Sequence, residues 1–463
     1  MSWSGWERAP RLFFCSRLPL LIFPVLTALL LWWWARQILS PAAAVVLAAL
    51  FALEPTALGH APLFKNDLAA TFGFLLFWYA AWKYWRRPGA GNAAALGAAL
   101  LVALLAKLSM LVLVPMAPLL VAARCLAGQP RRWRGAVLAF TLVVLIPYLG
   151  SIAAVQFETR RLQDGEFLRL REQNRMPEAF LFASNILRVV PYPVPLFDGA
   201  VSILQCEVKD SLVYFWGDFH PQGHPLYFVG ALALKSPVPL QILLLSGFAI
   251  AGLAALRRRL PAGSVFWLFP PVLYVGMASA MSLQMGVRLV LPALPFGLLA
   301  AGYAVEFLRK GRRVAVLAVL LAAMAGTTAH NYPHGISYFN LWAGSPENGS
   351  RYLSDSNVDW GQNLPDLGPE LDRLGISRVR LFYFGNDITT PYLRRDQVEE
   401  LPPPWEASFV DGTVYRPQPG YYAVSASLLP GHFFEPEYRD YFRVFREAKP
   451  IGRAGYSIYI YQF

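Results

Sequence analysis

The feature that most constrains this chain is a series of long apolar runs. A membrane-spanning helix needs roughly 20 predominantly apolar residues. The chain is 56% hydrophobic and only 15% charged, whereas soluble domains carry about 25% charged residues. We therefore expect a polytopic α-helical membrane protein with about ten spans. The predicted spans are 19–36, 41–53, 68–85, two short helices within 93–123 that meet near Lys107, 136–155, 237–256, 264–282, 289–308 and 314–330.

Basic residues at alternate junctions predict the orientation. They cluster at Arg36, at 83–87, 124–134, 257–259 and 309–313. The positive-inside rule places these junctions in the cytoplasm. Much of the net charge of +12 thus lies in short loops between the predicted spans. The sequence has no basic-aromatic module of the kind that binds nucleic acid, so we expect no nucleic-acid partner.

The same alternation divides the chain into parts. We interpret 1–330 as a multispanning membrane core, within which 156–225 is an extracytoplasmic loop segment without a long apolar run. The polar remainder, 331–463, then forms a small extracytoplasmic α/β domain. Leucines at helical spacing predict a helix over 364–374, and β-rich runs predict strands over 379–385, 420–426 and 456–463.

Polar residues are concentrated at one predicted extracytoplasmic junction. Glu54, His60, Lys65 and Asp67 lie within fourteen positions between two apolar runs. Charges at a membrane-helix end are costly unless they face a water-filled cavity or a polar ligand. The alternative is an ordinary solvated loop, and the spacing alone leaves both interpretations open.

A second polar group precedes the run at 237–256. Asp218, His220 and His224 are close in sequence, so a divalent metal is possible, although isolated loop histidines are more often unliganded. The three cysteines have no metal-ligand spacing, and we assign no metal site. Lys235 either extends its ammonium to the interface or serves as counter-ion for a lipid phosphate.

Two later segments complete the candidates. Arg288 lies at the predicted outer end of a span, where it departs from the positive-inside pattern. Because Arg binds phosphate through two parallel hydrogen bonds, a ligand role is favoured. The segment 354–359, SDSNVD, contains good turn and capping residues, and we interpret most of it as structural.

The motifs resemble those of a known family. They are ALEPTALGHAPLFKNDLAATFGFLLFWYAAWKY, LLAKLSMLVLVP, ALALKSPVPL, GVRLVLPALPF and, most specifically, YPHGISYFNLWAGSPENGSRYLSDSNVDWGQNL. In this order they resemble the bacterial dolichyl-phosphate-mannose–protein mannosyltransferase-like proteins, which are phospholipid-carrier-dependent glycosyltransferases of family thirty-nine. The resemblance implies a glycosyltransferase C-type core in the bacterial inner membrane, with its site at the outer face.

The resemblance also implies roles and partners. The donor would be a polyprenyl-phosphate sugar in the membrane lipid, and the acceptor a protein, lipid or glycan. Asp67 matches an acid of the family and would have a polar or catalytic role. The substrate-binding residues would be His60, Lys65, Lys235, Arg288, Asp218 and His224, with phosphate held by the three cations.

One departure from the family concerns the start of the chain. Family members carry an additional first span and then an acidic outer loop, whereas residues 1–17 contain Glu7 as their only acid. The orientation above also places Arg8, Arg11 and Arg17 outside, against their preference. We therefore expect a truncated chain that transfers sugar poorly. A transporter and a non-catalytic membrane scaffold are the alternative functions.

Overall fold

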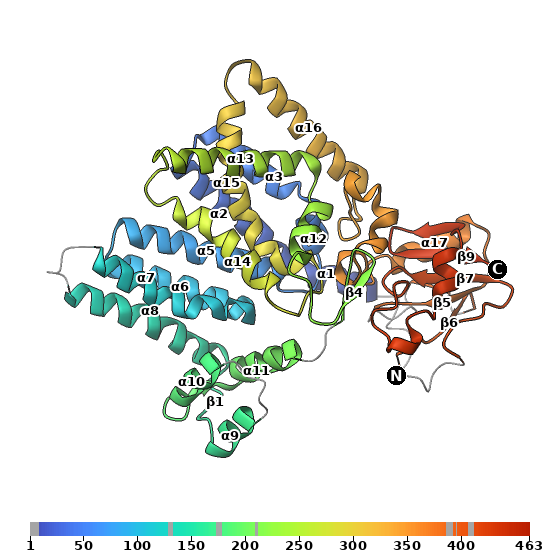
Figure 1. Cartoon of the computed structure of the whole chain (residues 1–463), viewed down its shortest axis with the longest axis horizontal. Coiled ribbons are helices and arrows are strands. Elements are labelled where there is room, and N and C mark those ends of the chain that lie inside the picture. The colour runs from blue at the N-terminus through green and yellow to red at the C-terminus, as the bar shows by residue number, and fades with distance from the viewer. Residues whose placement is uncertain are drawn as a thin grey trace.

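The computed structural model of this protein is mostly helical, with a sheet at one end (Figure 1). It describes residues 9–127, 133–172, 178–208, 212–385, 392–394, 396–405 and 412–463. Glu7 and Arg8 lie outside the described residues. Within these ranges six stretches are long and apolar enough to cross a membrane, in agreement with a helical membrane protein. They are Phe14–Ile38, Leu108–Leu126, Arg134–Ala154, Val238–Leu256, Val287–Leu308 and Gly311–Asn331.

Each predicted span coincides with a helix, although the count of ten membrane crossings stays a prediction. The helices are α2 (Ile22–Ile38), α3 (Pro41–Ala52), α5 (Asp67–Arg86), α6 (Ala90–Ala106), α7 (Leu113–Leu126), α8 (Trp133–Ala154), α13 (Val238–Leu256), α14 (Val265–Ser279), α15 (Leu294–Leu308) and α16 (Val314–Asn331). Two short helices, α1 (Ala9–Arg17) and α4 (Pro55–His60), accompany them.

Small residues let these helices approach closely, as is common in membrane bundles. A Cβ added at Gly73 of α5 would lie 2.7 Å from the Cα of Ala103 on α6. Gly247 of α13 likewise abuts the backbone of Ala300 and Ala301 on α15. Large aromatic rings fill the space that remains, with Trp34 within 6.3 Å of Trp267, centroid to centroid.

The predicted break near Lys107 is confirmed. Helix α6 ends at Ala106, Lys107 is extended, and the 3-10 helix η3 (Leu108–Val112) leads into α7. This break matters because it places the Lys107 side chain beside the first residue of α5.

The loop segment before α12 (Tyr227–Lys235) has its own elements. They are β1 (Thr159–Arg160), α9 (Asp164–Glu172), α10 (Glu178–Ile186), β2 (Tyr192–Pro193), α11 (Val194–Val208) and the hairpin of β3 (Val213–Phe215) and β4 (Asp218–His220). A small core that includes Leu162, Phe167 and Tyr192 holds the first part together.

The C-terminal residues form a five-stranded sheet. Its order is β6 (Val398–Glu400), β5 (Val379–Phe382), β7 (Tyr421–Ser425), β9 (Ile458–Gln462) and β8 (Gly452–Ala454). Strand β5 is parallel to both β6 and β7, and β9 is antiparallel to β7 and β8. The predicted helix is α17 (Leu364–Arg373), whose Leu364, Leu367 and Leu371 pack in one core with Leu381 and Ile460 of the sheet.

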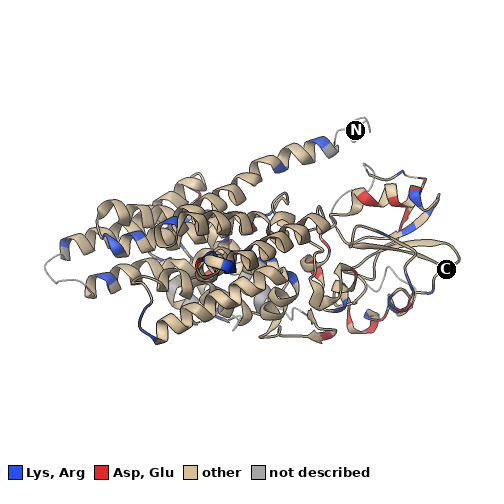
Figure 2. Ribbon diagram, turned by 90° about the horizontal axis from the view of Figure 1, so that it is seen from above, with Lys and Arg blue, Asp and Glu red and all other residues tan. Residues whose placement is uncertain are grey.

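The opposite side of the sheet joins the membrane part. One apolar cluster combines Tyr422 and Val424 of the sheet with Phe228 of α12 (Tyr227–Lys235) and Val290 of η5 (Val287–Ala293). Figure 2 shows Lys and Arg at the helix ends farthest from the sheet, whereas residues of both charge signs lie around the sheet. This distribution agrees with the predicted orientation, which itself stays a prediction.

Candidate functional site

A largely buried group of three charges lies at the helix ends that face the C-terminal sheet. Asp67 begins α5 and is 2% exposed. Its Oδ1 is 2.5 Å from the Lys107 Nζ, and its Oδ2 is 3.3 Å from the Arg288 Nη1. We call these three residues the Asp67 cluster. Because two cations share one carboxylate, the cluster carries a net positive charge.

The local fold explains why Arg288 points at this carboxylate. Arg288 lies on η5, which begins after Gly286. Gly286 has φ +139°, and an added Cβ would collide with Ser356. The Ser356 Oγ accepts a hydrogen bond of 3.0 Å from the Arg288 Nε, and the Asn357 Oδ1 accepts one of 2.9 Å from the Val287 N–H. The 354–360 loop therefore holds Arg288 on one side, and Asp67 holds it on the other side.

A tryptophan connects the cluster with a cavity. The Arg288 guanidinium is 4.6 Å from the centroid of the Trp360 ring, and the Lys65 Nζ is 4.9 Å from it. Trp360 and Lys65 both line a cavity of about 840 Å³, a volume in the range of small-molecule sites. We call it the Trp360 cavity. Its other walls include Arg17, Gly59, Phe64, His334, Asn363, Asp366, Tyr383 and Trp405.

One carboxylate faces this cavity among the described residues that line it. It is Asp366, which is half-buried in the first turn of α17. The Asn363 amide donates to the Asp366 Oδ2 at 2.7 Å and lies 2.9 Å from the His334 Nδ1. Ser457 donates to the Asn363 Oδ1 at 2.9 Å, so the amide is held in place. The carboxylate is thereby oriented while part of it stays accessible.

His60 and Glu54 lie behind the cavity wall. The His60 Nδ1 is 2.8 Å from the Thr56 carbonyl oxygen, while its Nε2 is buried and has no hydrogen-bond partner among the described residues. Glu54 accepts a bond of 2.6 Å from the Ala57 N–H and thus caps α4. Neither residue lines the Trp360 cavity.

Lys235 occupies a different, fully enclosed place. Its Nζ donates to the carbonyl oxygens of Ile336 and Asn357, each at 2.5 Å, and lies 4.4 Å from the Phe339 ring centroid. An ammonium has three donors, so two of them are used on the backbone. Lys235 therefore links α12 to the backbone at Ile336 and at Asn357, in the two segments beside the Trp360 cavity.

Asp218 and His224 are not brought to the Asp67 cluster. Asp218 is exposed on β4, and the His224 Nδ1 accepts a bond of 3.2 Å from the Leu226 N–H. The His224 ring packs against Phe215, 4.9 Å between centroids. Among the described residues no group of three His, Cys, Asp or Glu side chains could hold a metal ion.

The loop interpreted from the sequence as turn and capping residues supplies much of the site. Ser356 and Asn357 hold η5, and Asp359 accepts a bond of 2.9 Å from the Gly361 N–H. Burial raises the pKa of Asp359 to about 7 and that of Asp355 to about 6. The signal available in the sequence was the density of Asp, Asn and Ser before Trp360.

Comparison with known proteins gives no further guidance. No family model matches the chain, and no curated protein matches it. Function is therefore argued from the site itself.

Proposed function

We propose that the protein is an integral membrane glycosyltransferase. It would move a sugar from a polyprenyl-phosphate donor to a hydroxyl group of a protein, lipid or glycan at the extracytoplasmic face of the bacterial plasma membrane. The observation that carries the proposal is the Asp67 cluster, a net positive group at a membrane-helix end beside the Trp360 cavity.

The placement suits an amphiphilic donor. A polyprenyl chain stays among apolar helices, so its phosphate would reach the helix ends where Lys65, Lys107 and Arg288 gather. Arg288 is preorganised, because Ser356 and Asp67 fix its guanidinium before any ligand arrives. Cations that are held in place stabilise charge developing on a leaving phosphate without a reorganisation cost.

Asp366 is our candidate for the general base. Asp67 is already paired with two cations, which leaves it poorly suited to take a proton. In the proposed step Asp366 takes the acceptor's hydroxyl proton while that oxygen bonds to the anomeric carbon. The bond from this carbon to the phosphate oxygen breaks, and the electron pair leaves with the phosphate. One displacement of this kind inverts the anomeric carbon.

The test compares donor binding with sugar transfer in proteoliposomes. Asp366→Asn is expected to lower transfer about a hundredfold to ten-thousandfold, the usual contribution of a general base, while donor binding stays within about twofold. The matched control is Asp372→Asn on the same helix, since Asp372 is exposed and pairs with Arg394.

Two outcomes would contradict the proposal. If the unmodified chain neither binds nor consumes polyprenyl-phosphate sugars, the assignment as a transferase is wrong. If it transfers sugar and Asp366→Asn transfers equally well, the transferase stands and another group is the base.

A further inference from the structure

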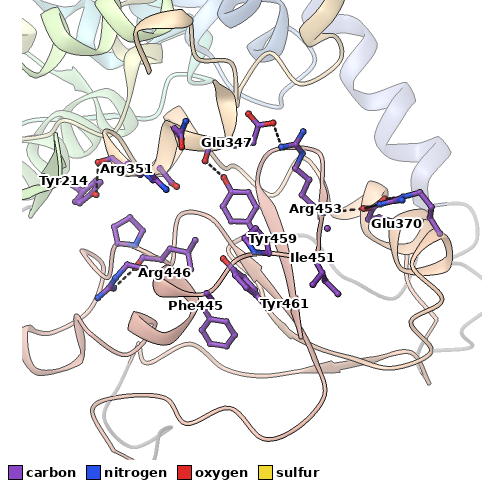
Figure 3. A pocket seen from close by; sticks show the side chains of 18 residues that line it. Tyr214, Glu347, Arg351, Glu370, Phe445, Arg446, Ile451, Arg453, Tyr459 and Tyr461 are labelled. Carbon is purple, nitrogen blue, oxygen red and sulfur yellow. Dashed lines mark hydrogen bonds and ion pairs between the residues drawn. The ribbon is translucent and has the colours of Figure 1, made fainter. Parts of the chain in front are cut away.

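A second cavity lies against the C-terminal sheet (Figure 3). It has a volume of about 700 Å³ and shares no lining residue with the Trp360 cavity. Its walls come from η8 (Pro346–Arg351), α17, the short helix α18 (Arg443–Glu447) and the strands β8 and β9. We call it the sheet cavity.

Arginines outnumber acids on its walls. Four arginines and two glutamates line the sheet cavity, and Arg446 pairs with Asp440 outside the lining, which leaves one arginine in excess. Both acids are already paired: Glu370 accepts two bonds of 2.7 Å from Arg373, and Glu347 pairs with Arg453. Arg351 has no hydrogen-bond or ion-pair partner for its guanidinium anywhere in the described ranges. The Arg351 guanidinium is therefore accessible, and no carboxylate among the described residues neutralises its charge.

Two tyrosines of β9 also line the sheet cavity. Tyr459 and Tyr461 are two positions apart on β9 and so face the same side of the sheet. The Tyr459 hydroxyl donates to the Glu347 carbonyl oxygen at 3.0 Å. Tyr461 is 2% exposed as a whole residue and lines the cavity. Figure 3 shows it between Tyr459 and Phe445.

These observations identify the chemistry of the ligand. An Arg fork and a phenol donor match the oxygens of a phosphate or carboxylate. The volume is too large for a lone oxyanion and lies in the range of small-molecule sites. The remaining walls include amide and hydroxyl groups from Asn348 and Ser350 and apolar surface from Ile451. Such mixed walls suit a molecule with hydroxyl edges and C–H faces.

We propose that the sheet cavity binds an acidic saccharide through its phosphate or carboxylate group, with Arg351 and Tyr461 as the anion contacts. The binding itself stands without the proposed sugar transfer. Only the further role, in which the saccharide is part of the acceptor, rests on that proposed function.

The experiment measures binding without any donor lipid. The purified full chain in detergent is titrated by calorimetry with glucose 6-phosphate, glucuronate, glucose and inorganic phosphate. We expect one or both acidic sugars to bind more tightly than glucose and inorganic phosphate. Which of the two binds distinguishes a phosphorylated saccharide from a uronic acid.

Variants locate the site. Arg351→Ala is expected to weaken acidic-sugar binding about tenfold or more, since a hydrogen bond to a charged group contributes about that factor. Arg351→Lys should lose less, because it keeps the charge, and Tyr461→Phe should weaken binding severalfold with the unfolding temperature unchanged. The control is Arg378→Ala, an exposed arginine that pairs with Glu399 outside the cavity.

Three results would overturn the proposal: absence of acidic-sugar binding, equal binding of glucose or inorganic phosphate, or unchanged affinity after Arg351→Ala. Its failure is separable from that of the proposed transferase. Arg288→Ala should weaken donor binding and leave acidic-sugar binding intact, so the two sites are tested with different ligands.

Discussion

Replacing Arg288 tests the phosphate site most directly. The guanidinium donates to Ser356 at 3.0 Å and to Asp67 at 3.3 Å, and it lies over Trp360. Its remaining N–H groups are the ones we assign to the donor phosphate. A hydrogen bond to a charged group contributes about 1.5–3 kcal/mol, so Arg288→Ala is expected to weaken donor binding roughly ten- to hundredfold.

The lysine variant separates charge from geometry. Arg288→Lys keeps the positive charge but loses the planar fork and the bond from Nε to Ser356. We therefore expect an affinity between those of the wild type and Arg288→Ala. The fold should survive both changes, because Asp67 keeps its partner Lys107 at 2.5 Å. We expect the free energy of unfolding to fall by about 1–3 kcal/mol.

The assay is a titration of the purified protein in nanodiscs with a short-chain polyprenyl-phosphate sugar, followed by calorimetry and by tryptophan fluorescence. Trp360 is next to Arg288, so its emission should change on binding. The control is Arg309→Ala, whose arginine pairs with Glu306 at the end of α15. Equal affinity in all variants, or an equal loss in the control, would refute the assignment of Arg288 to phosphate.

Three further predictions concern stability and orientation. Lys235→Met should lower the free energy of unfolding by about 2–3 kcal/mol, because two buried carbonyl oxygens lose a charged donor. An unchanged denaturation midpoint would argue against the structural role of Lys235. Since burial raises the pKa of Asp359 to about 7 from about 4 in the unfolded chain, the folded state binds the extra proton. Stability should thus fall as pH rises from 4 to 7, and Asp359→Asn should flatten that slope in thermal unfolding at several pH values. In a variant without native cysteines, Gln163→Cys and Glu437→Cys, both at exposed positions, should react with an impermeant reagent in spheroplasts; protection of both until lysis would reverse the predicted orientation.

The elements of the fold were largely predictable because local patterns decide them. Each apolar run of spanning length coincides with a helix, and Lys107 predicted the break between α6 and η3. The short helices α9, α10, α11 and α12 were not predicted. Alternating and β-branched residues predicted β5, β7 and β9. The short strands β6 and β8 were missed, because three-residue segments carry little periodic signal.

The candidate site was predictable only in part. The sequence indicated Asp67, Lys65 and Arg288 from the cost of charge at a helix end. The structure places Lys65 and Arg288 against Trp360 and pairs Arg288 with Asp67. The same cost argument could not separate ligand-facing cations from structural ones. Lys235 satisfied it equally and is enclosed by backbone carbonyls.

What the sequence by itself determined is the membrane class, the helices and the choice of polar residues, since each depends on composition and spacing along the chain. The tertiary structure alone decided which of these residues meet. Asp67 and Arg288 are 221 positions apart, and no local pattern reports a contact across that separation. The accessible carboxylate of Asp366 and the sheet cavity likewise arise where separate segments pack, because a cavity belongs to the space between elements rather than to any one of them.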